Sequence, residues 1–331
     1  MSSGSSLPYK LRPNKAVDRE LFLALLNRLA AHLKIESYRY VGLGGPFLED
    51  FRLIHARLGI DDMVCIDFEE SVHKRQVFNR PVDCIECVNS TLEEYIDSTE
   101  FEKPVIIWFD YTDPGKITDQ IERFSRTISE VPINSVLRVT LNANPTSLGK
   151  PDPTEIAVEV GGMGGDHSGQ KKTIQEWRLD RFRECLGSLF PSDLKADGMT
   201  FKNFGRSVLR ALYLAVEKEA LSLPDRKIVW SLATHYADGQ PMITATLIVC
   251  APEAGTVESF VKGWEYFSTP DVPLLLDMPA LSTLERLTME SCENARERMG
   301  FDLPKSDMGE DPFRSFRRFY RVFPHFSRVE L

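Results

Sequence analysis

The most constraining stretch of this 331-residue chain is Val105-Ile-Ile-Trp-Phe109, which is apolar at every position and is followed directly by Asp110. A strand without polar positions must be covered on both faces, which is typical of the centre of a parallel sheet. Further runs rich in strand-forming residues lie at 38–41, 62–67, 82–88 and 135–141, with helical patterns between them. This alternation predicts an α/β fold whose parallel strands are joined by right-handed crossovers.

The first of these strands runs into a turn that contains Gly42, Gly44 and Gly45, and an amphipathic segment begins at Pro46. Glycines allow the backbone to turn sharply and leave room for a ligand to approach it. A strand, a glycine turn and a helix begin the nucleotide-type site of many open α/β sheets. Because Gly-x-Gly is common, this interpretation depends on the strand ends that follow.

The second strand ends in Asp67, 23 residues after Gly44. This is close to the spacing at which an acid meets the two hydroxyls of a ribose. A carboxylate suits a cis-diol because it accepts two hydrogen bonds. Phe68 follows and is included with Asp67 among the candidate cofactor contacts. Glu69 and Glu70 come next, so the acceptor stays open, as does the alternative of a solvated strand-end acid.

Polar residues also follow the third and fourth strands. Asn89 and Ser90 come after the third, and Asp110, Tyr111 and Asp113 after the fourth. Open α/β sheets hold their sites at the carboxyl ends of the strands, so we expect these side chains at one edge. The alternatives are a plain turn at Asn89, a helix cap at Ser90 and a tight Asp-Pro-Gly turn after the fourth strand.

Two further strands, at 227–235 and 241–249, flank an Asp238-Gly239 turn and predict an antiparallel hairpin. His235 lies at the start of the predicted turn. It is either a general base or an ordinary turn histidine.

The element pattern divides the chain into three parts. Residues 1–36 form an N-terminal helical segment, residues 37–250 the main domain with an insertion at about 143–200, and residues 251–331 a helical extension. The insertion contains a glycine-rich loop at 161–169, which is either a lid over the site or a linker.

Basic and aromatic residues alternate in the C-terminal segment 313–323. One interpretation is a nucleic-acid contact, with arginines on phosphates and aromatic rings on bases. The other is a helix that docks on the core, or on a protein partner, through aromatic residues at helical spacing: Phe316, Phe319, Tyr320 and Phe323. The net charge of −9 favours docking.

Composition excludes several classes. The negative net charge gives no global indication of nucleic-acid or membrane binding, and no apolar run is long enough to span a bilayer. Six dispersed cysteines fit a reducing, cytoplasmic setting. Cys84 and Cys87 are three apart on a predicted strand and would point to opposite faces, so we expect no metal site there.

The order of elements resembles the class I S-adenosylmethionine-dependent methyltransferases, and a bacterial group described as putative O-methyltransferases within them. The resemblance covers about residues 38–250. It implies a Rossmann-like, mostly parallel sheet with a terminal antiparallel hairpin and helices on both faces. It also implies S-adenosyl-L-methionine as cofactor, with the glycine turn passing its methionine part. The next three strand ends would contact the rest of it: Asp67 the ribose hydroxyls, Asn89 and Ser90 the adenine, and Asp110 the amino group and the transferred methyl.

Three departures accompany this resemblance. Tyr40 stands where the family usually has an acid, Pro46 and Phe47 stand where a third loop glycine is common, and the segment after Asp110 is not the Asp/Asn-Pro-Pro-aromatic motif of enzymes that methylate amino groups of nucleic acids. Glu49 and Asp50 follow the glycine turn and would repel a pyrophosphate, which favours S-adenosylmethionine over a dinucleotide.

We therefore expect an enzyme that transfers a methyl group to an oxygen of an unidentified acceptor. Asp110 or Asp113 would remove the acceptor proton and Tyr111 would orient the acceptor. The alternative is a non-catalytic module that binds a nucleoside or S-adenosylmethionine as a regulatory or assembly subunit, which Tyr40 motivates. A nicotinamide-dependent oxidoreductase is the third hypothesis.

Overall fold

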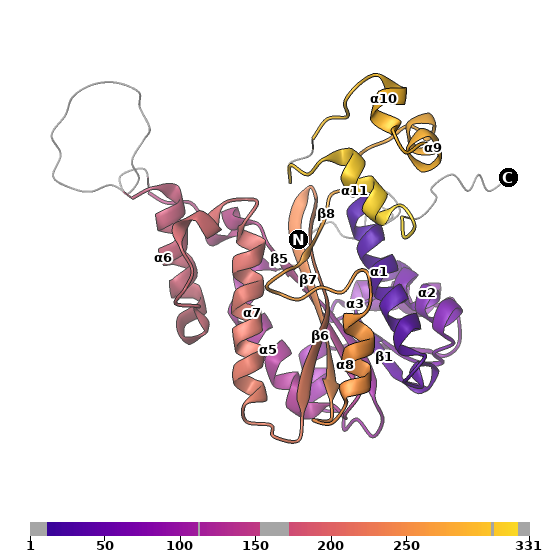
Figure 1. Ribbon diagram of the computed structural model, residues 1–331. Coiled ribbons are helices and arrows are strands. Elements are labelled where there is room, and N and C mark those ends of the chain that lie inside the picture. Colours follow the sequence, from indigo (N-terminus) through magenta and orange to yellow (C-terminus); the bar gives the residue numbers. More distant parts are fainter. Residues whose placement is uncertain (1–11, 112, 153–171, 306–307, 324–331) are drawn as a thin grey trace.

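A computed structural model describes residues 12–111, 113–152, 172–305 and 308–323. Its centre is one eight-stranded sheet in the order β3-β2-β1-β4-β5-β7-β6-β8 (Figure 1). The strands are β1 (Arg39–Gly42), β2 (Asp62–Ile66), β3 (Ile85–Val88), β4 (Val105–Asp110), β5 (Val136–Asn142), β6 (Lys227–Asp238), β7 (Gln240–Cys250) and β8 (Leu274–Leu276). Within the described ranges, no helix is both long and apolar enough to cross a membrane.

The sheet confirms the expected fold class. Strands β1 to β5 are parallel, β7 is inserted antiparallel between β5 and β6, and Gly239 turns the hairpin with a positive φ of 90°. The apolar run Val105–Phe109 forms β4 between β1 and β5, and every one of its residues is buried. Because both faces of β4 are covered, its sequence carries no polar position.

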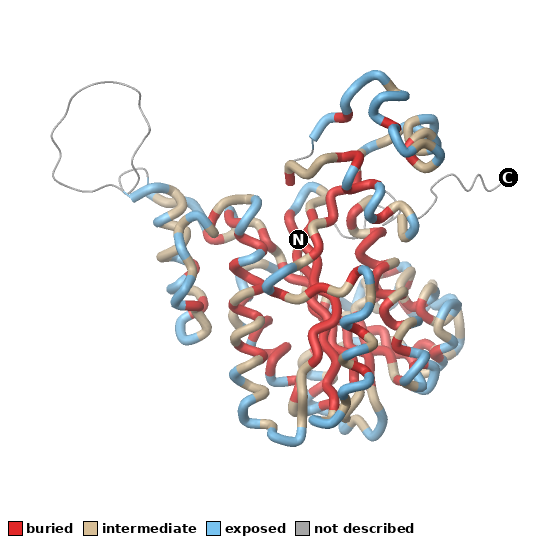
Figure 2. Tube along the Cα trace, viewed as in Figure 1, coloured by how far each residue is buried: buried red, intermediate tan, exposed pale blue. Residues whose placement is uncertain are grey.

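Helices cover both faces of the sheet, and the buried strands lie between them (Figure 2). One core lies under α1, α2, α8 and α11, and the other under α4, α5, α6 and α7. The helices are α1 (Pro13–Leu29), α2 (Glu49–Leu58), α3 (Glu70–Asn79), α4 (Leu92–Asp97), α5 (Ile117–Glu130), α6 (Ile174–Leu186), α7 (Phe204–Ala220), α8 (Gly255–Lys262), α9 (Thr283–Ser291), α10 (Ala295–Met299) and α11 (Pro312–Phe319).

A buried polar cluster joins α1 to the middle of the sheet. Asp18 accepts hydrogen bonds from Arg138 of β5 at 2.5 Å and from Thr234 and Thr244 of the hairpin at 2.7 and 3.0 Å. The Arg138 side chain is fully buried, and it also donates to Thr246 at 2.8 Å. This cluster fixes the helix on one face of the sheet.

The hairpin turn also holds the first turn of α1. The carboxylate of Asp238 accepts from the backbone N–H groups of Asn14 and Lys15, at 3.3 and 2.8 Å. A carboxylate is favourable there because the first N–H groups of a helix lack partners within the helix. The start of α1 therefore lies at the carboxyl edge of the parallel strands.

The segment after the glycine turn differs from the expectation. Pro46 lies in a 3₁₀ turn (Gly45–Phe47), and Leu48 has a positive φ of 49°, so α2 begins only at Glu49. Phe47 is 55% exposed and does not share the buried face of α2, contrary to the sequence pattern.

The C-terminal part is less helical than expected, because Leu274–Leu276 adds β8 parallel to β6. Docking of α11 on the core of this chain is confirmed: Phe316 and Phe319 are buried, and Phe319 stacks on Tyr266. The glycine-rich loop 161–169 lies outside the described residues.

Candidate functional site

A cavity of about 1060 Å³ opens at the carboxyl ends of β2, β3 and β4 and extends along α5. It brings together most of the expected strand-end residues, and its walls include Asp67, Phe68, Ser90, Asp110, Tyr111 and Asp113. From the glycine turn, Leu43 lines it. The sequence thus located the edge of the sheet at which the cavity lies.

The glycines of the turn serve its packing. A Cβ on Gly44 would lie 2.6 Å from Cys65 Sγ and 2.9 Å from the Phe51 ring, so the turn can rest on β2 and α2 only without a side chain there. Gly45 has a φ of 50°, a conformation that favours glycine. A Cβ on Gly42 would lie 3.1 Å from the hydroxyl of Tyr40.

Asp67 lies at the end of β2 with one oxygen available. Its Oδ1 accepts from the backbone N–H of Glu69 at 2.9 Å, and Oδ2 has no hydrogen-bond partner among the described residues. Burial raises the pKa of this carboxyl above its ordinary value. The Phe68 ring beside it is 75% exposed, an unusual position for a large apolar side chain.

The residues after β3 have structural partners. The Asn89 side chain donates to the backbone carbonyl of Asp67 at 2.8 Å and so ties the ends of β2 and β3 together. Ser90 donates to Glu94 at 3.0 Å, beside the capping box that Thr91 and Glu94 form at the start of α4. Of these two expected contacts, Ser90 lines the cavity.

The two carboxylate oxygens of Asp110, at the end of β4, differ in their partners. Its Oδ1 is buried and has no hydrogen-bond partner in the described part of the chain. Its Oδ2 lies 3.7 Å from the Lys15 ammonium of α1. Because an unpaired buried oxygen is costly, this carboxylate is suited to a ligand that donates a hydrogen bond.

Tyr111 and Asp113 differ in how far they are engaged. The Tyr111 hydroxyl donates to Glu93 at 2.8 Å, and burial, together with that carboxylate, raises the pKa of the phenol. Asp113 is exposed, and its Oδ1 accepts from the N–H of Gly115 at 2.9 Å. Residue 112 between them is outside the described residues.

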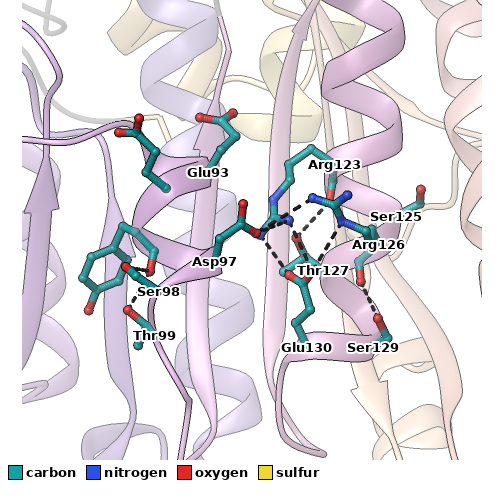
Figure 3. A network of polar contacts seen from close by, with 12 residues as sticks. Glu93, Asp97, Ser98, Thr99, Arg123, Ser125, Arg126, Thr127, Ser129 and Glu130 are labelled. Carbon is teal, nitrogen blue, oxygen red and sulfur yellow. Dashed lines mark hydrogen bonds and ion pairs between the residues drawn. The ribbon is translucent and has the colours of Figure 1, made fainter.

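An ion-pair network stiffens the wall between α4 and α5 (Figure 3). Arg123 lies 2.9 Å from both Asp97 of α4 and Glu130 of α5, and its side chain is only 6% exposed. Arg126 adds a contact of 3.8 Å to Asp97. Glu93 precedes this network by one turn of α4, so the partner of Tyr111 is held by a fixed helix.

Sequence reasoning missed the contribution of α1. Arg19 lies 2.7 Å from Asp50 and 4.0 Å from Glu49, so a cation from α1 accompanies both acids at the start of α2. The expected repulsion of a pyrophosphate is therefore weaker than these acids alone suggest. The apolar periodicity of α1 marks its core face only, and no local signal identifies Lys15 or Arg19 as neighbours of the site.

His235 is not a turn residue. It is 2% exposed within β6, which continues to Asp238, and burial with the nearby Arg206 lowers the pKa of its imidazole to about 4. It does not line the large cavity. Among the described residues, no three of His, Cys, Asp and Glu are grouped as metal ligands would be.

Some solved structures are similar to this chain at low identity and with low TM-scores. The N-methyltransferase NodS from Bradyrhizobium japonicum, in complex with S-adenosyl-L-homocysteine, is 9% identical with a TM-score of 0.39, and the match covers 76% of this chain and 94% of that one. The plantazolicin methyltransferase BamL, solved with S-adenosylhomocysteine, is 12% identical with a TM-score of 0.37, over 72% and 85%. An enzyme from Klebsiella pneumoniae described as a putative O-methyltransferase is 11% identical with a TM-score of 0.36, over 76% and 93%. No protein of curated function matches the sequence.

The sequence profile of one family matches residues 7–331, which is almost the whole chain including the C-terminal part. The family is described as "Putative O-methyltransferase". This match confirms the expectation of a methyltransferase, and with it S-adenosylmethionine as the methyl donor. The chain belongs to this O-methyltransferase family.

Proposed function

We propose that the protein transfers the methyl group of S-adenosylmethionine to an oxygen of an acceptor bound in the large cavity. The observation that carries this proposal is the Asp110 carboxylate at the end of the central strand, whose buried Oδ1 has no hydrogen-bond partner among the residues that the structure describes. The family description supports oxygen as the accepting atom.

The charges beside β4 fit the amino-acid part of this cofactor. That part is a zwitterion with an ammonium and a carboxylate attached to the same carbon. Asp110 and Lys15 present the complementary charges 3.7 Å apart. We assign the ammonium to Asp110 and the carboxylate to Lys15, since each charged group would then gain a charge-assisted hydrogen bond.

The other end of the cofactor would lie along β2 and β3. Asp67 Oδ2 is available to accept from the ribose hydroxyls, and the exposed Phe68 ring offers a flat apolar surface to the adenine. Stacking on such a ring requires no specific hydrogen bond. The bound cofactor supplies a methyl group on a positive sulfonium, and the protein has to hold an acceptor in line with it.

Two acids were candidates for removing the acceptor proton. With Asp110 assigned to the cofactor, we assign this role to Asp113, which is exposed and lines the cavity. Its Oδ1 accepts the hydrogen bond of the turn from Gly115, and its Oδ2 takes no part in that bond. Tyr111 keeps its hydroxyl on Glu93, and it positions the wall of the cavity.

Calorimetry on the full chain tests the cofactor assignment. We expect saturable binding of S-adenosylmethionine and S-adenosylhomocysteine and none of NAD. A folded protein that binds NAD and neither sulfur compound would contradict the proposal. Binding of S-adenosylmethionine without formation of S-adenosylhomocysteine in the presence of cell extract would favour the alternative, a non-catalytic binding module. That alternative is motivated by Tyr40, which stands where the family usually has an acid.

A further inference from the structure

A second, smaller cavity of about 170 Å³ lies at the start of α7. Its polar walls are Lys202, Asn203, Arg206 and His235, and it shares no lining residue with the large cavity. The volume is several times that of one water molecule and admits a group of the size of phosphate.

A buried imidazole forms the inner wall of this cavity. His235 is 2% exposed, and its Nε2 is buried without a hydrogen-bond partner in the described residues. A Cβ on Gly205 would lie 2.6 Å from this nitrogen, so the absence of a side chain there lets the ring reach the first turn of α7. Buried polar nitrogens in native proteins normally have a partner, which indicates that something else fills this role.

Two cations form the outer wall. Lys202 and Arg206 are exposed, and neither has an acidic partner within the described ranges. By contrast Arg210, one turn further along α7, is paired with Asp193 and Asp271 at 3.2 and 3.5 Å. Surface cations without acids beside a cavity favour an anion inside it.

The α7 helix adds to the positive electrostatic potential that these cations create in the small cavity. α7 has 17 residues, and no side chain caps its first turn, because the Asn203 amide donates to the carbonyl of Asp197. The N-terminal end of a helix carries partial positive charge, which attracts anions. At this end the N–H groups of Phe204 and Arg206 already donate to the carbonyls of Thr200 and Asn203, so the helix contributes through its dipole.

We propose that the start of α7, with Lys202, Arg206 and His235, is a binding site for a phosphate-type oxyanion. A tetrahedral anion can accept from the two cations and the imidazole at the same time, in the positive field of the helix N-terminus. The imidazole donates as a neutral N–H, so it needs no proton uptake at neutral pH.

The position of the site in the sheet bears on which ligand it binds. His235 is three residues from the hairpin tip, at the same edge as Asp110, and β6 is three strands from β4. At about 4.8 Å per strand this separation is about 14 Å. The anion is either free phosphate or the phosphate group of a larger ligand that extends along this edge.

Calorimetry of the full chain with inorganic phosphate, at constant ionic strength in chloride, tests the site. We expect saturable one-site binding, weakened about tenfold or more in both Lys202→Gln and Arg206→Gln, because each loses a charge-assisted hydrogen bond. Arg210→Gln is the matched control and should keep the affinity, because its charge is already paired. Unsaturable binding, or equal affinity in Arg206→Gln and the unmodified protein, would overturn the proposal.

Two further measurements complete the test. Glycerol phosphate distinguishes the sources: tighter binding than inorganic phosphate indicates a larger ligand, and equal binding indicates the free anion. The imidazole resonances of His235 should shift on phosphate addition, and unchanged resonances would count against the site. Neither readout depends on methyl transfer, so the result is independent of the activity proposed above.

Discussion

Arg138 and Asp18 form an ion pair of 2.5 Å in the interior of the protein, between β5 and α1. The exposed fractions of the two side chains are 0% and 1%. The guanidinium also lies over the rings of Phe22 and Trp108, so its flat faces are packed as well. The pair fixes the helix that brings Lys15 to the end of β4.

Asp18→Ala should destabilise the protein by about 3–5 kcal/mol, because it leaves the Arg138 charge buried without its partner. Urea unfolding followed by circular dichroism measures this loss. Glu20→Ala on the same helix removes a partly exposed pair with Arg57 and should cost at most about 1 kcal/mol. Equal losses in the two variants would show that burial of the pair contributes little.

Asp67→Ala should weaken binding of S-adenosylhomocysteine by about tenfold to a hundredfold, because it removes a charged acceptor of the ribose hydroxyls. Asp61→Ala is the control, since Asp61 is exposed and precedes the other end of β2. Isothermal calorimetry gives both affinities. Unchanged binding in Asp67→Ala would refute the ribose assignment.

Lys15→Gln should weaken S-adenosylhomocysteine about tenfold and leave methylthioadenosine unaffected, because only the former carries the carboxylate assigned to Lys15. Competition binding with the two ligands measures the difference. The exposed Lys34 offers a control, and Lys34→Gln should bind both ligands as the unmodified protein does. A parallel loss for both ligands in Lys15→Gln would instead indicate a general disturbance of α1.

Stability should fall as the pH is lowered from about 6.5 to about 4, with a contribution from His235. Its folded pKa of about 4 is below the unfolded value of 6.5, so in this window the unfolded chain binds more protons. Above pH 6.5 the His235 imidazole is neutral in both the folded and the unfolded state. Below pH 4 the free energy of unfolding is lower by the full contribution of this group, about 3 kcal/mol.

His235→Gln should reduce the difference in unfolding free energy between pH 7 and pH 5, and His32→Gln, which alters an exposed histidine, should not. An NMR titration of the unmodified protein gives the same information without a variant. A midpoint near 6.5 for His235 would contradict the burial argument.

The sheet was predictable from sequence because each of its main strands carries its own apolar pattern. The apolar run Val105–Phe109 predicted the central strand, and the strand-end acids Asp67 and Asp110 indicated the edge of the sheet at which the cavity lies. These signals are local, since parallel strands must be covered and polar residues end them.

The features of the fold that the sequence pattern did not predict depend on contacts with residues far away along the chain. β8 has three residues and exists through its pairing with β6, which no local propensity reveals. Leu48 adopts a positive φ that leucine rarely takes, so the sequence pattern carried α2 too far toward the glycines. The polar face of α1 has a recognisable role only once its contacts with β4, β5 and α2 are known.

The cap that Asp238 provides to α1 has a consequence for the order in which the protein forms. Its acceptor oxygens stand 223 and 224 positions after the N–H groups that they bind, and Asp18 reaches Thr244 across 226 positions. Contacts of such separation form late, because a long loop must close first. During synthesis α1 leaves the ribosome long before the β6–β7 hairpin, to which it is bonded in the folded protein, has been made. The contact between Lys15 and Asp110, to which we assign the methionine part of the cofactor, therefore forms only after the hairpin has emerged.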